Sequence, residues 1–148
     1  LKLALELGSD VPFFILGKGC FVSGKGEIVE PISLPKLDFL LVLPDFSVST
    51  EEAYAAVDLG ISGKGLASRK IRDNFDVSVL HNDFEVSVFE NHPELGEIKK
   101  LLVSNGAENA LLSGSGSCVY GVFMDEGKLN DAFSSLKEKY KVLKVKSV

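Results

Sequence analysis

Residues 109–123 read NALLSGSGSCVYGVF, and this stretch decides the fold. Two apolar runs of strand length lie on either side of a loop of alternating serine and glycine at 113–117. Such runs, joined by a short glycine-containing loop, predict two central strands at 109–112 and 118–123. The loop lacks the lysine of a P-loop and no helix begins directly after it, so it fits neither that motif nor the dinucleotide-binding fingerprint.

The elements around this stretch complete a regular order. A helix is expected at 128–140 and a last strand at 142–148, while an apolar run at 39–43, ended by Pro44, predicts the first strand. Between 43 and 109, Ser49 and Glu52 form a capping-box pattern that opens a helix through about residue 57, and further helices are expected at 66–72, from Asn82 and from Pro93. The order β–α(several)–β–β–α–β predicts an α+β, ferredoxin-like split βαβ domain over 37–148, with an antiparallel sheet and helices on one face.

The first 36 residues follow a different pattern. We expect a mostly buried helix at 1–7 ended by Gly8, a turn at 9–12, a short buried strand at 13–16, and a hairpin with strands at 20–23 and 27–32. Residues 33–36 form a proline-containing connector, which predicts a domain boundary and divides the chain into 1–36 and 37–148. The chain begins without methionine, in a helix already under way, so we expect it to be the back part of a longer protein.

Composition excludes several classes of protein. The chain has 148 residues, of which 45% are hydrophobic and 25% charged, as in ordinary globular domains. Its net charge of −5 argues against nucleic-acid binding, and no apolar run approaches the roughly 18 residues of a membrane span. No secretion signal is recognisable, and Cys20 and Cys118 have no metal-ligand spacing, so we interpret them as buried, reduced thiols of a cytoplasmic protein.

Three groups of residues are candidates for chemistry. Asp10 lies on a tight turn next to an apolar run, a rigid setting that suits an acid/base group, although an aspartate in a turn often only bonds the local backbone. Gly114, Ser115 and Gly116 let backbone N–H groups converge on an anion, unless the loop is a plain hairpin turn. Thr50 and Tyr54 share a helix face, where the ring either stacks on a planar group or belongs to the core or to half-buried surface. No metal site is predicted.

The motifs together resemble one family. GSDVPFF at 8–14, GKGE at 24–27, VSTEEAY at 48–54, NDFE at 82–85 and LSGSGS at 112–117 occur in this order, and their combination is similar to the C-terminal part of the GHMP kinase superfamily, within it the 4-diphosphocytidyl-2-C-methyl-D-erythritol kinases. The resemblance implies ATP-dependent phosphorylation of the 2-hydroxyl of a CDP-linked methylerythritol, a step of the non-mevalonate isoprenoid pathway, with ATP and Mg²⁺ as cofactors.

The resemblance also implies roles for the candidate residues. Asp10 matches the family's catalytic aspartate, which serves as base or orienting group for the attacking hydroxyl. Gly114, Ser115 and Gly116 match a loop that lies against the phosphates and the acceptor. Thr50 and Tyr54 match positions that line the cytidine pocket, with the ring stacked on cytosine.

The sequence departs from the family in one large respect. The glycine- and serine-rich ATP-phosphate loop and the lysine that works with the aspartate are absent from these residues. We therefore expect residues 1–36 to be the tail of an N-terminal kinase domain, the missing N-terminal half to be the partner of this chain, and the chain alone to be inactive. Two alternatives stay open, a GHMP kinase for homoserine or a mevalonate-type acid, and a non-catalytic ferredoxin-like ligand-binding module.

Overall fold

A four-stranded antiparallel sheet forms the centre of the molecule. The structure, a computed structural model, describes residues 2–56 and 75–147. The sheet has the strand order β4 (Asn109–Leu112), β5 (Val119–Phe123), β3 (Asp38–Leu43) and β6 (Lys141–Lys146). Every neighbouring pair is antiparallel, with Leu40 opposite Gly121 on one side and Lys144 on the other. This is the strand order of a split βαβ unit, so the predicted ferredoxin-like α+β fold is confirmed.

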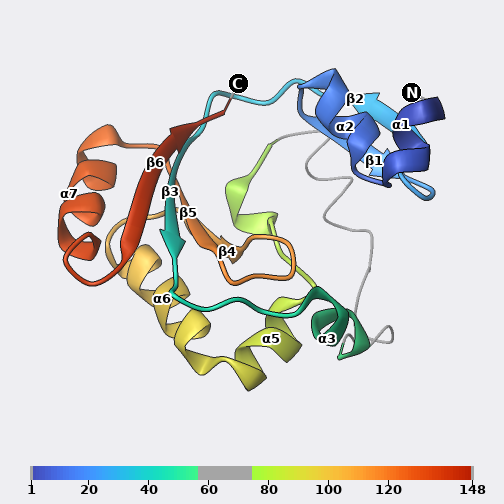
Figure 1. The fold of residues 1–148 in the computed structure, drawn as a ribbon. Helices are drawn as coiled ribbons and strands as arrows, with labels where there is room; N and C mark the ends of the chain where they lie inside the picture. The colour runs from blue at the N-terminus through green and yellow to red at the C-terminus, as the bar shows by residue number, and fades with distance from the viewer. Residues whose placement is uncertain (1, 57–74, 148) are drawn as a thin grey trace.

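Two helices cover one face of the sheet. They are α6 (Pro93–Ser104) and α7 (Glu126–Leu136), which lie on the same side of the strands in Figure 1. The strands alternate, so that Leu40 and Val42 of β3 point toward these helices and have no exposed surface. The helices contribute residues at the predicted spacings of three and four, and the resulting core includes Leu95, Ile98, Leu102, Leu129, Ala132 and Leu136.

The opposite face of the sheet carries a smaller apolar cluster. Leu37 and Val122 pack there with Val77, which lies in the 3₁₀ helix η1 (Val77–Val79). The end of β6 closes this region, because Leu37 donates its N–H to Ser147 Oγ and accepts the Ser147 N–H, both at 2.9 Å. The C-terminal end of the described chain is therefore tied to the point where the domain begins (Figure 1).

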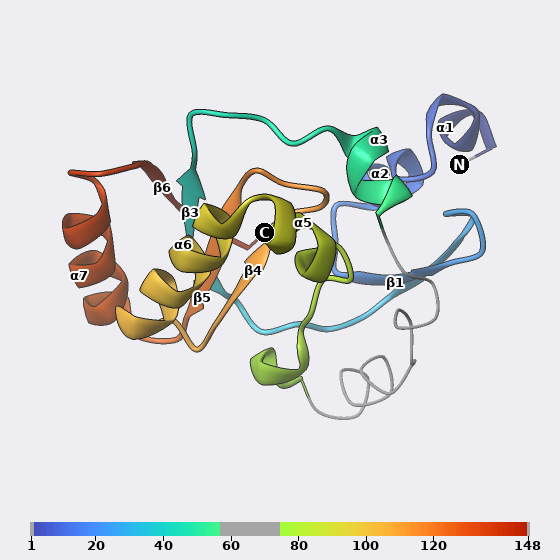
Figure 2. The same ribbon diagram turned by 90° about the horizontal axis from the view of Figure 1, so that it is seen from below.

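The N-terminal unit, residues 2–31, consists of two short helices and a hairpin and lies at one end of the molecule (Figures 1 and 2). It contains α1 (Lys2–Leu7), α2 (Val11–Leu16), and the antiparallel strands β1 (Cys20–Ser23) and β2 (Ile28–Pro31). The hairpin is confirmed. The predicted strand at 13–16 is wrong, because Pro12 occupies the first turn of a helix, a position that its fixed φ favours, and the apolar run continues that helix.

The prediction that α1 is mostly buried is also wrong. Leu3 is 77% exposed and Leu7 82%, and only Ala4 is buried. Apolar spacing shows which face of a helix avoids water, but burial requires another element on that face. Within the described residues α1 packs chiefly against α2, and one short helix covers little of its surface.

The remaining predictions have mixed outcomes. The helices α3 (Thr50–Ala55) and α5 (Glu85–Asn91) lie near their expected positions, while the helix expected at 66–72 lies outside the described residues. Cys20 and Cys118 are free thiols, but both are half-buried rather than buried. No helix in the described ranges is long and apolar enough to span a bilayer. The boundary at 33–36 stays a prediction.

Candidate active site

The serine–glycine loop between β4 and β5 is a tight turn that requires its glycines. Ser113 donates its N–H to Cys118 O at 2.8 Å, and Gly116 donates to Ser113 O at 3.0 Å. Gly114 and Gly116 have φ of +57° and +99°, which L-residues with side chains rarely adopt. A Cβ on Gly116 would also lie 3.2 Å from Leu112 Cδ1. The loop therefore has one defined shape, in contrast to a floppy hairpin turn.

Helix α3 brings Thr50 to this loop. Ser49 caps the helix by accepting the Glu52 N–H at 3.3 Å, as the capping-box pattern predicts. The cap fixes the first turn, and there Thr50 Oγ1 lies 3.0 Å from Ser115 Oγ, within hydrogen-bond distance. Two residues that are 65 positions apart in sequence, and that the motifs assign to the cytidine pocket and the phosphate loop, thus touch.

Tyr54 projects from the same helix. Its side chain is 66% exposed, and its ring meets the Phe84 ring edge-to-face with the centroids 4.8 Å apart. The contact holds the ring in place while most of its surface stays open to solvent, which is the state that stacking on a planar ligand requires. The alternative that Tyr54 joins the core is wrong.

Asn82 contacts the loop and Glu85 contacts the end of β4 that leads into it, and the sequence did not predict either contact. Asn82 accepts the Phe84 N–H at 3.0 Å, as expected of a residue that starts a helix, but its amide nitrogen also donates to Leu112 O and Gly114 O at 2.8 and 2.7 Å. Glu85 Oε1 accepts the Leu112 N–H at 2.9 Å. The sequence indicated for Asn82 only the start of a helix and gave Glu85 no role of its own.

Asp10 lies in the N-terminal unit, on the turn between α1 and α2. Its side chain is exposed and makes no cap hydrogen bond, so the local-turn role is not the one observed. The hairpin supports the turn, because Gly26, with φ of +102°, approaches Ser9 so closely that a Cβ there would lie 2.0 Å from Ser9 O. Among the described residues no hydrogen bond or ion pair joins Asp10 to Thr50, Tyr54 or the loop.

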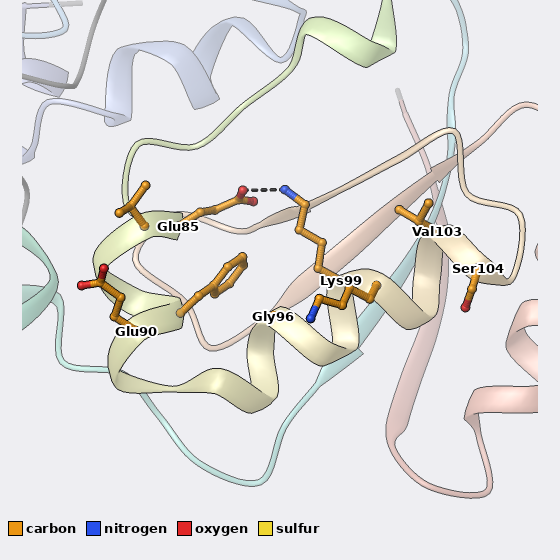
Figure 3. Close-up of a pocket in the computed structure, with 9 residues that line it drawn as sticks. Glu85, Glu90, Gly96, Lys99, Val103 and Ser104 are labelled. Atoms are coloured by element: carbon orange, nitrogen blue, oxygen red, sulfur yellow. Dashed lines mark hydrogen bonds and ion pairs between the residues drawn. The ribbon is translucent and has the colours of Figure 1, made fainter.

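A large hollow of the described surface lies elsewhere, between α5 and α6 (Figure 3). It is an open groove of about 780 Å³ with apolar walls from Val86, Phe89 and Val103. Glu85 and Lys99 point toward one another at its edge and form an ion pair with an N–O distance of 2.5 Å (Figure 3). None of the candidate residues from the sequence lines this groove, so it is not the predicted substrate site.

The family assignment follows from comparison with known proteins. A family model of the GHMP kinase C-terminal region matches residues 56–142, which is more than half of the chain. The chain belongs to the GHMP kinases. The match begins directly after α3, the helix that carries Tyr54, and ends in β6. It therefore includes the serine–glycine loop and the segment 82–85 that contacts the loop and the end of β4.

Individual relatives show which GHMP kinases this chain is similar to. A 4-diphosphocytidyl-2-C-methyl-D-erythritol kinase of Thermodesulfovibrio yellowstonii is 40% identical over 149 aligned residues, which cover 92% of this chain and 51% of that protein. One of Desulfotalea psychrophila is 38% identical and covers 100% of this chain and 53% of that protein. The chain thus spans about half the length of the curated relatives it matches. The resemblance expected from the motifs is confirmed.

Solved structures agree with the GHMP kinase fold. A crystal structure of 4-(cytidine 5′-diphospho)-2C-methyl-D-erythritol kinase matches with a TM-score of 0.85 and 30% identity, over 98% of this chain and 55% of that one. A homoserine kinase from Cytophaga hutchinsonii matches with a TM-score of 0.70 at 15% identity, over 93% of this chain and 50% of that one, which shows a shared fold only.

Proposed function

We propose that these residues are the C-terminal part of an ATP-dependent kinase that phosphorylates the 2-hydroxyl of 4-diphosphocytidyl-2-C-methyl-D-erythritol. One observation carries the proposal: the hydrogen-bonding contact between Thr50 and Ser115 joins the helix with the exposed aromatic ring to the serine–glycine loop. A nucleotide-linked substrate has both a base and phosphates. It therefore needs an aromatic ring that stacks on the base and a loop that faces the phosphates. Homoserine or a mevalonate-type acid has no planar base, so it gives the exposed Tyr54 ring no role.

In this proposal the loop binds and orients. Its internal hydrogen bonds use the N–H groups of Ser113 and Gly116, and the N–H groups of Gly114 and Ser115 are the donors we assign to a phosphate or acceptor oxygen. Phosphoryl transfer needs alignment and charge stabilisation more than covalent chemistry, so fixed backbone donors suit it. Thr50 sets the position of Ser115, and Tyr54 forms one wall for the cytosine.

Asp10 is the proposed general base or orienting group. Its exposed carboxylate makes no cap hydrogen bond, and it sits on a turn braced by the hairpin. In this role it accepts the proton of the substrate hydroxyl as that oxygen attacks the terminal phosphorus of ATP, while the bond from that phosphorus to the ADP oxygen breaks.

ATP and Mg²⁺ are part of the proposal as the phosphate donor and its accompanying cation. Within 2–56 and 75–147 no three His, Cys, Asp or Glu side chains gather as metal ligands. Because Mg²⁺ in phosphoryl-transfer sites is usually held by one or two carboxylates together with waters and substrate phosphates, no residue of this chain is assigned to it, and no step here depends on one. The phosphate loop for ATP is assigned to the partner, an N-terminal half of the same protein.

An acceptor panel tests the proposed function. The full-length protein that carries these residues is incubated with ATP and, in separate reactions, 4-diphosphocytidyl-2-C-methyl-D-erythritol, homoserine and mevalonate, and ADP release is followed. We expect turnover with the cytidylated acceptor alone and none from the 148-residue chain by itself. Preference for homoserine or mevalonate, or measurable turnover by the isolated chain, would contradict the proposal.

A further inference from the structure

We propose that Asn82 and Glu85 are positioning residues that hold the serine–glycine loop and the Tyr54 ring in one rigid arrangement. The inference rests on the proposed function for its kinetic consequence, but its structural part stands apart from that function. Neither residue reaches the proposed reacting groups. They act through the loop, which they contact from outside, at the end of β4 and at the first glycine of the turn.

The Asn82 side chain uses both of its ends. Its Nδ2 donates to the carbonyl oxygens of Leu112 and Gly114 at 2.8 and 2.7 Å, and its Oδ1 accepts the Phe84 N–H at 3.0 Å. A primary amide has two N–H donors, and here both point at the loop, on either side of Ser113. The amide therefore fixes where β4 ends and where the turn begins.

Glu85 holds the same strand end from the other direction. Its Oε1 accepts the Leu112 N–H at 2.9 Å, and its Oε2 pairs with Lys99 Nζ at 2.5 Å. The Glu85 side chain is only 14% exposed and that of Lys99 30%, so the carboxylate is largely shielded from solvent, which strengthens its charge-assisted hydrogen bonds. Lys99 comes from α6, which packs on the sheet, so the rigid core of the domain fixes the Glu85 carboxylate.

Phe84 connects this segment to the Tyr54 ring, the proposed wall of the cytosine pocket. It lies between the two positioning residues in sequence, and its ring supports the Tyr54 ring with centroids 4.8 Å apart. Three residues of one short segment thus fix the loop and the aromatic wall together. The fourth residue of the segment, Asp83, faces solvent: its side chain is 43% exposed, and it lies 3.6 Å from His81. Asp83 is the natural matched control.

Asn82→Asp tests the inference with minimal change in shape. The new carboxylate still accepts the Phe84 N–H, so α5 keeps its start, but it faces two carbonyl oxygens without a donor. In the full-length protein we expect amide hydrogen exchange at Gly116 and Leu112 to speed up at least tenfold. We expect kcat to fall about 10–100-fold, with KM for the cytidylated acceptor within about threefold, because a small misplacement of reacting groups lowers the rate that strongly.

Asp83→Asn is the control. It replaces a carboxylate by an amide at the adjacent residue, which is the opposite change to Asn82→Asp. It should leave both the exchange rates and kcat unchanged. A merely structural role for Asn82 predicts a lower melting temperature with a proportional loss of active protein and no selective change in exchange at the loop. Unchanged exchange in Asn82→Asp, or equal effects of the two substitutions, would overturn the inference.

A second pair of variants tests the inference if Asn82→Asp does not fold. Glu85→Gln is compared with Glu97→Gln as its control. Glu97 also pairs with a lysine, Lys100 at 2.7 Å, but on an exposed surface. We expect only Glu85→Gln to speed up exchange at Leu112, because an amide placed beside the Lys99 ammonium cannot satisfy both partners. Equal exchange in the two variants would overturn the inference. Fast exchange in Glu85→Gln, with no turnover of any acceptor by the unaltered protein, would support the positioning and contradict only the proposed function.

Discussion

The N-terminal unit and the C-terminal domain differ in how much of their apolar surface they bury. In the N-terminal unit, Leu3, Leu7 and Phe14 are at least 74% exposed. In the domain, Leu40, Leu95 and Leu102 have no exposed surface. The domain therefore has a core of its own, while the unit has mainly its turns and a hairpin. The proposed catalytic carboxylate lies on the weakly packed unit, and the loop it would serve lies on the rigid domain.

This difference separates chemistry from stability. Hydrophobic burial is the dominant favourable term in folding, so substitutions in the domain core should lower the free energy of unfolding most. Asp10 makes no cap hydrogen bond in its turn, so its replacement should change the rate and leave stability nearly the same. Substitutions in the two regions should thus separate into two kinds of effect.

The largest effect is expected from Asp10→Asn in the full-length protein. The amide keeps the shape of the carboxyl but cannot take the proton of the attacking hydroxyl. We expect kcat to fall about 10²–10⁴-fold, the range for loss of a general base, with the melting temperature nearly unchanged. Steady-state kinetics with the cytidylated acceptor measures this, and a normal rate would remove Asp10 from the mechanism.

The next effect compares the two regions directly. Leu40→Ala removes a fully buried side chain of β3 and should lower the free energy of unfolding by about 2–5 kcal/mol. Leu7→Ala in α1 shortens a side chain that is 82% exposed. This substitution should change the free energy of unfolding by less than about 0.5 kcal/mol. Urea denaturation of each variant of the 148-residue chain checks both values. Similar losses would mean that the unit is packed as tightly as the domain.

Tyr54→Ala should have a smaller, selective effect. Loss of a base-stacking ring typically weakens binding by about 1–3 kcal/mol, so KM for the cytidylated acceptor should rise about 5–150-fold. KM for ATP should stay within about twofold, because no ATP contact is assigned to Tyr54. Tyr54→Phe keeps the ring and serves as the control. Equal losses for both substrates would count against the pocket assignment.

The smallest expected effect is on how stability depends on pH. The C-terminal domain should lose stability at high pH, and the N-terminal hairpin should lose it at low pH. Burial raises the pKa of the Cys118 thiol and, with smaller effects of Glu85 and Cys118, that of Tyr120. The folded domain thus holds these protons more tightly than the unfolded chain, so stability is lost as pH rises above about 9, the ordinary thiol pKa. Melting curves between pH 8 and 10.5 should show this fall, and Tyr120→Phe should reduce it.

In the hairpin, backbone hydrogen bonds to its own N–H and to that of Lys25 lower the pKa of Glu27. Its contribution is therefore present above the ordinary carboxyl pKa and is lost as pH falls below about 4.5. The protection of the β1 and β2 amides, which is their exchange rate corrected for the intrinsic rate at each pH, should fall in acid, and Glu27→Gln should remove that dependence. Acid-sensitive exchange that persists in Glu27→Gln would assign the effect to another group.

Sequence patterns predicted the domain well because its elements are locally consistent. The strands β3, β4 and β5 carry apolar runs, and the helix after Pro93 buries Leu95, Ile98 and Leu102 at regular spacings. Each pattern agrees with the contacts the sheet provides. In the first unit the same rules failed at 13–16, because an apolar run of four residues fits a strand or a helix equally well. Proline at the first turn decided in favour of the helix.

The candidate site was predictable where one residue carries the signal. The helix start at Ser49 and the glycines of the loop follow from motif and backbone requirements, and the contact of Thr50 with Ser115 brings two predicted site residues together. The roles assigned to these residues stay predictions. The positions of Asn82 and Glu85 were not predictable, because their partners at 112 and 114 are about 30 residues away and are carbonyl or N–H groups. Backbone groups are present in every residue, so a sequence contains no sign of which one a side chain will choose.

A crystal structure of the full-length protein, with the cytidylated acceptor and a non-hydrolysable ATP analogue bound, tests the central proposal most directly. We expect the Asp10 carboxylate about 2.6–3.2 Å from the 2-hydroxyl of the acceptor, the cytosine stacked on Tyr54, and phosphate or acceptor oxygens at the N–H groups of Gly114 and Ser115. An acceptor hydroxyl far from Asp10, or a cytosine bound away from Tyr54, would contradict it.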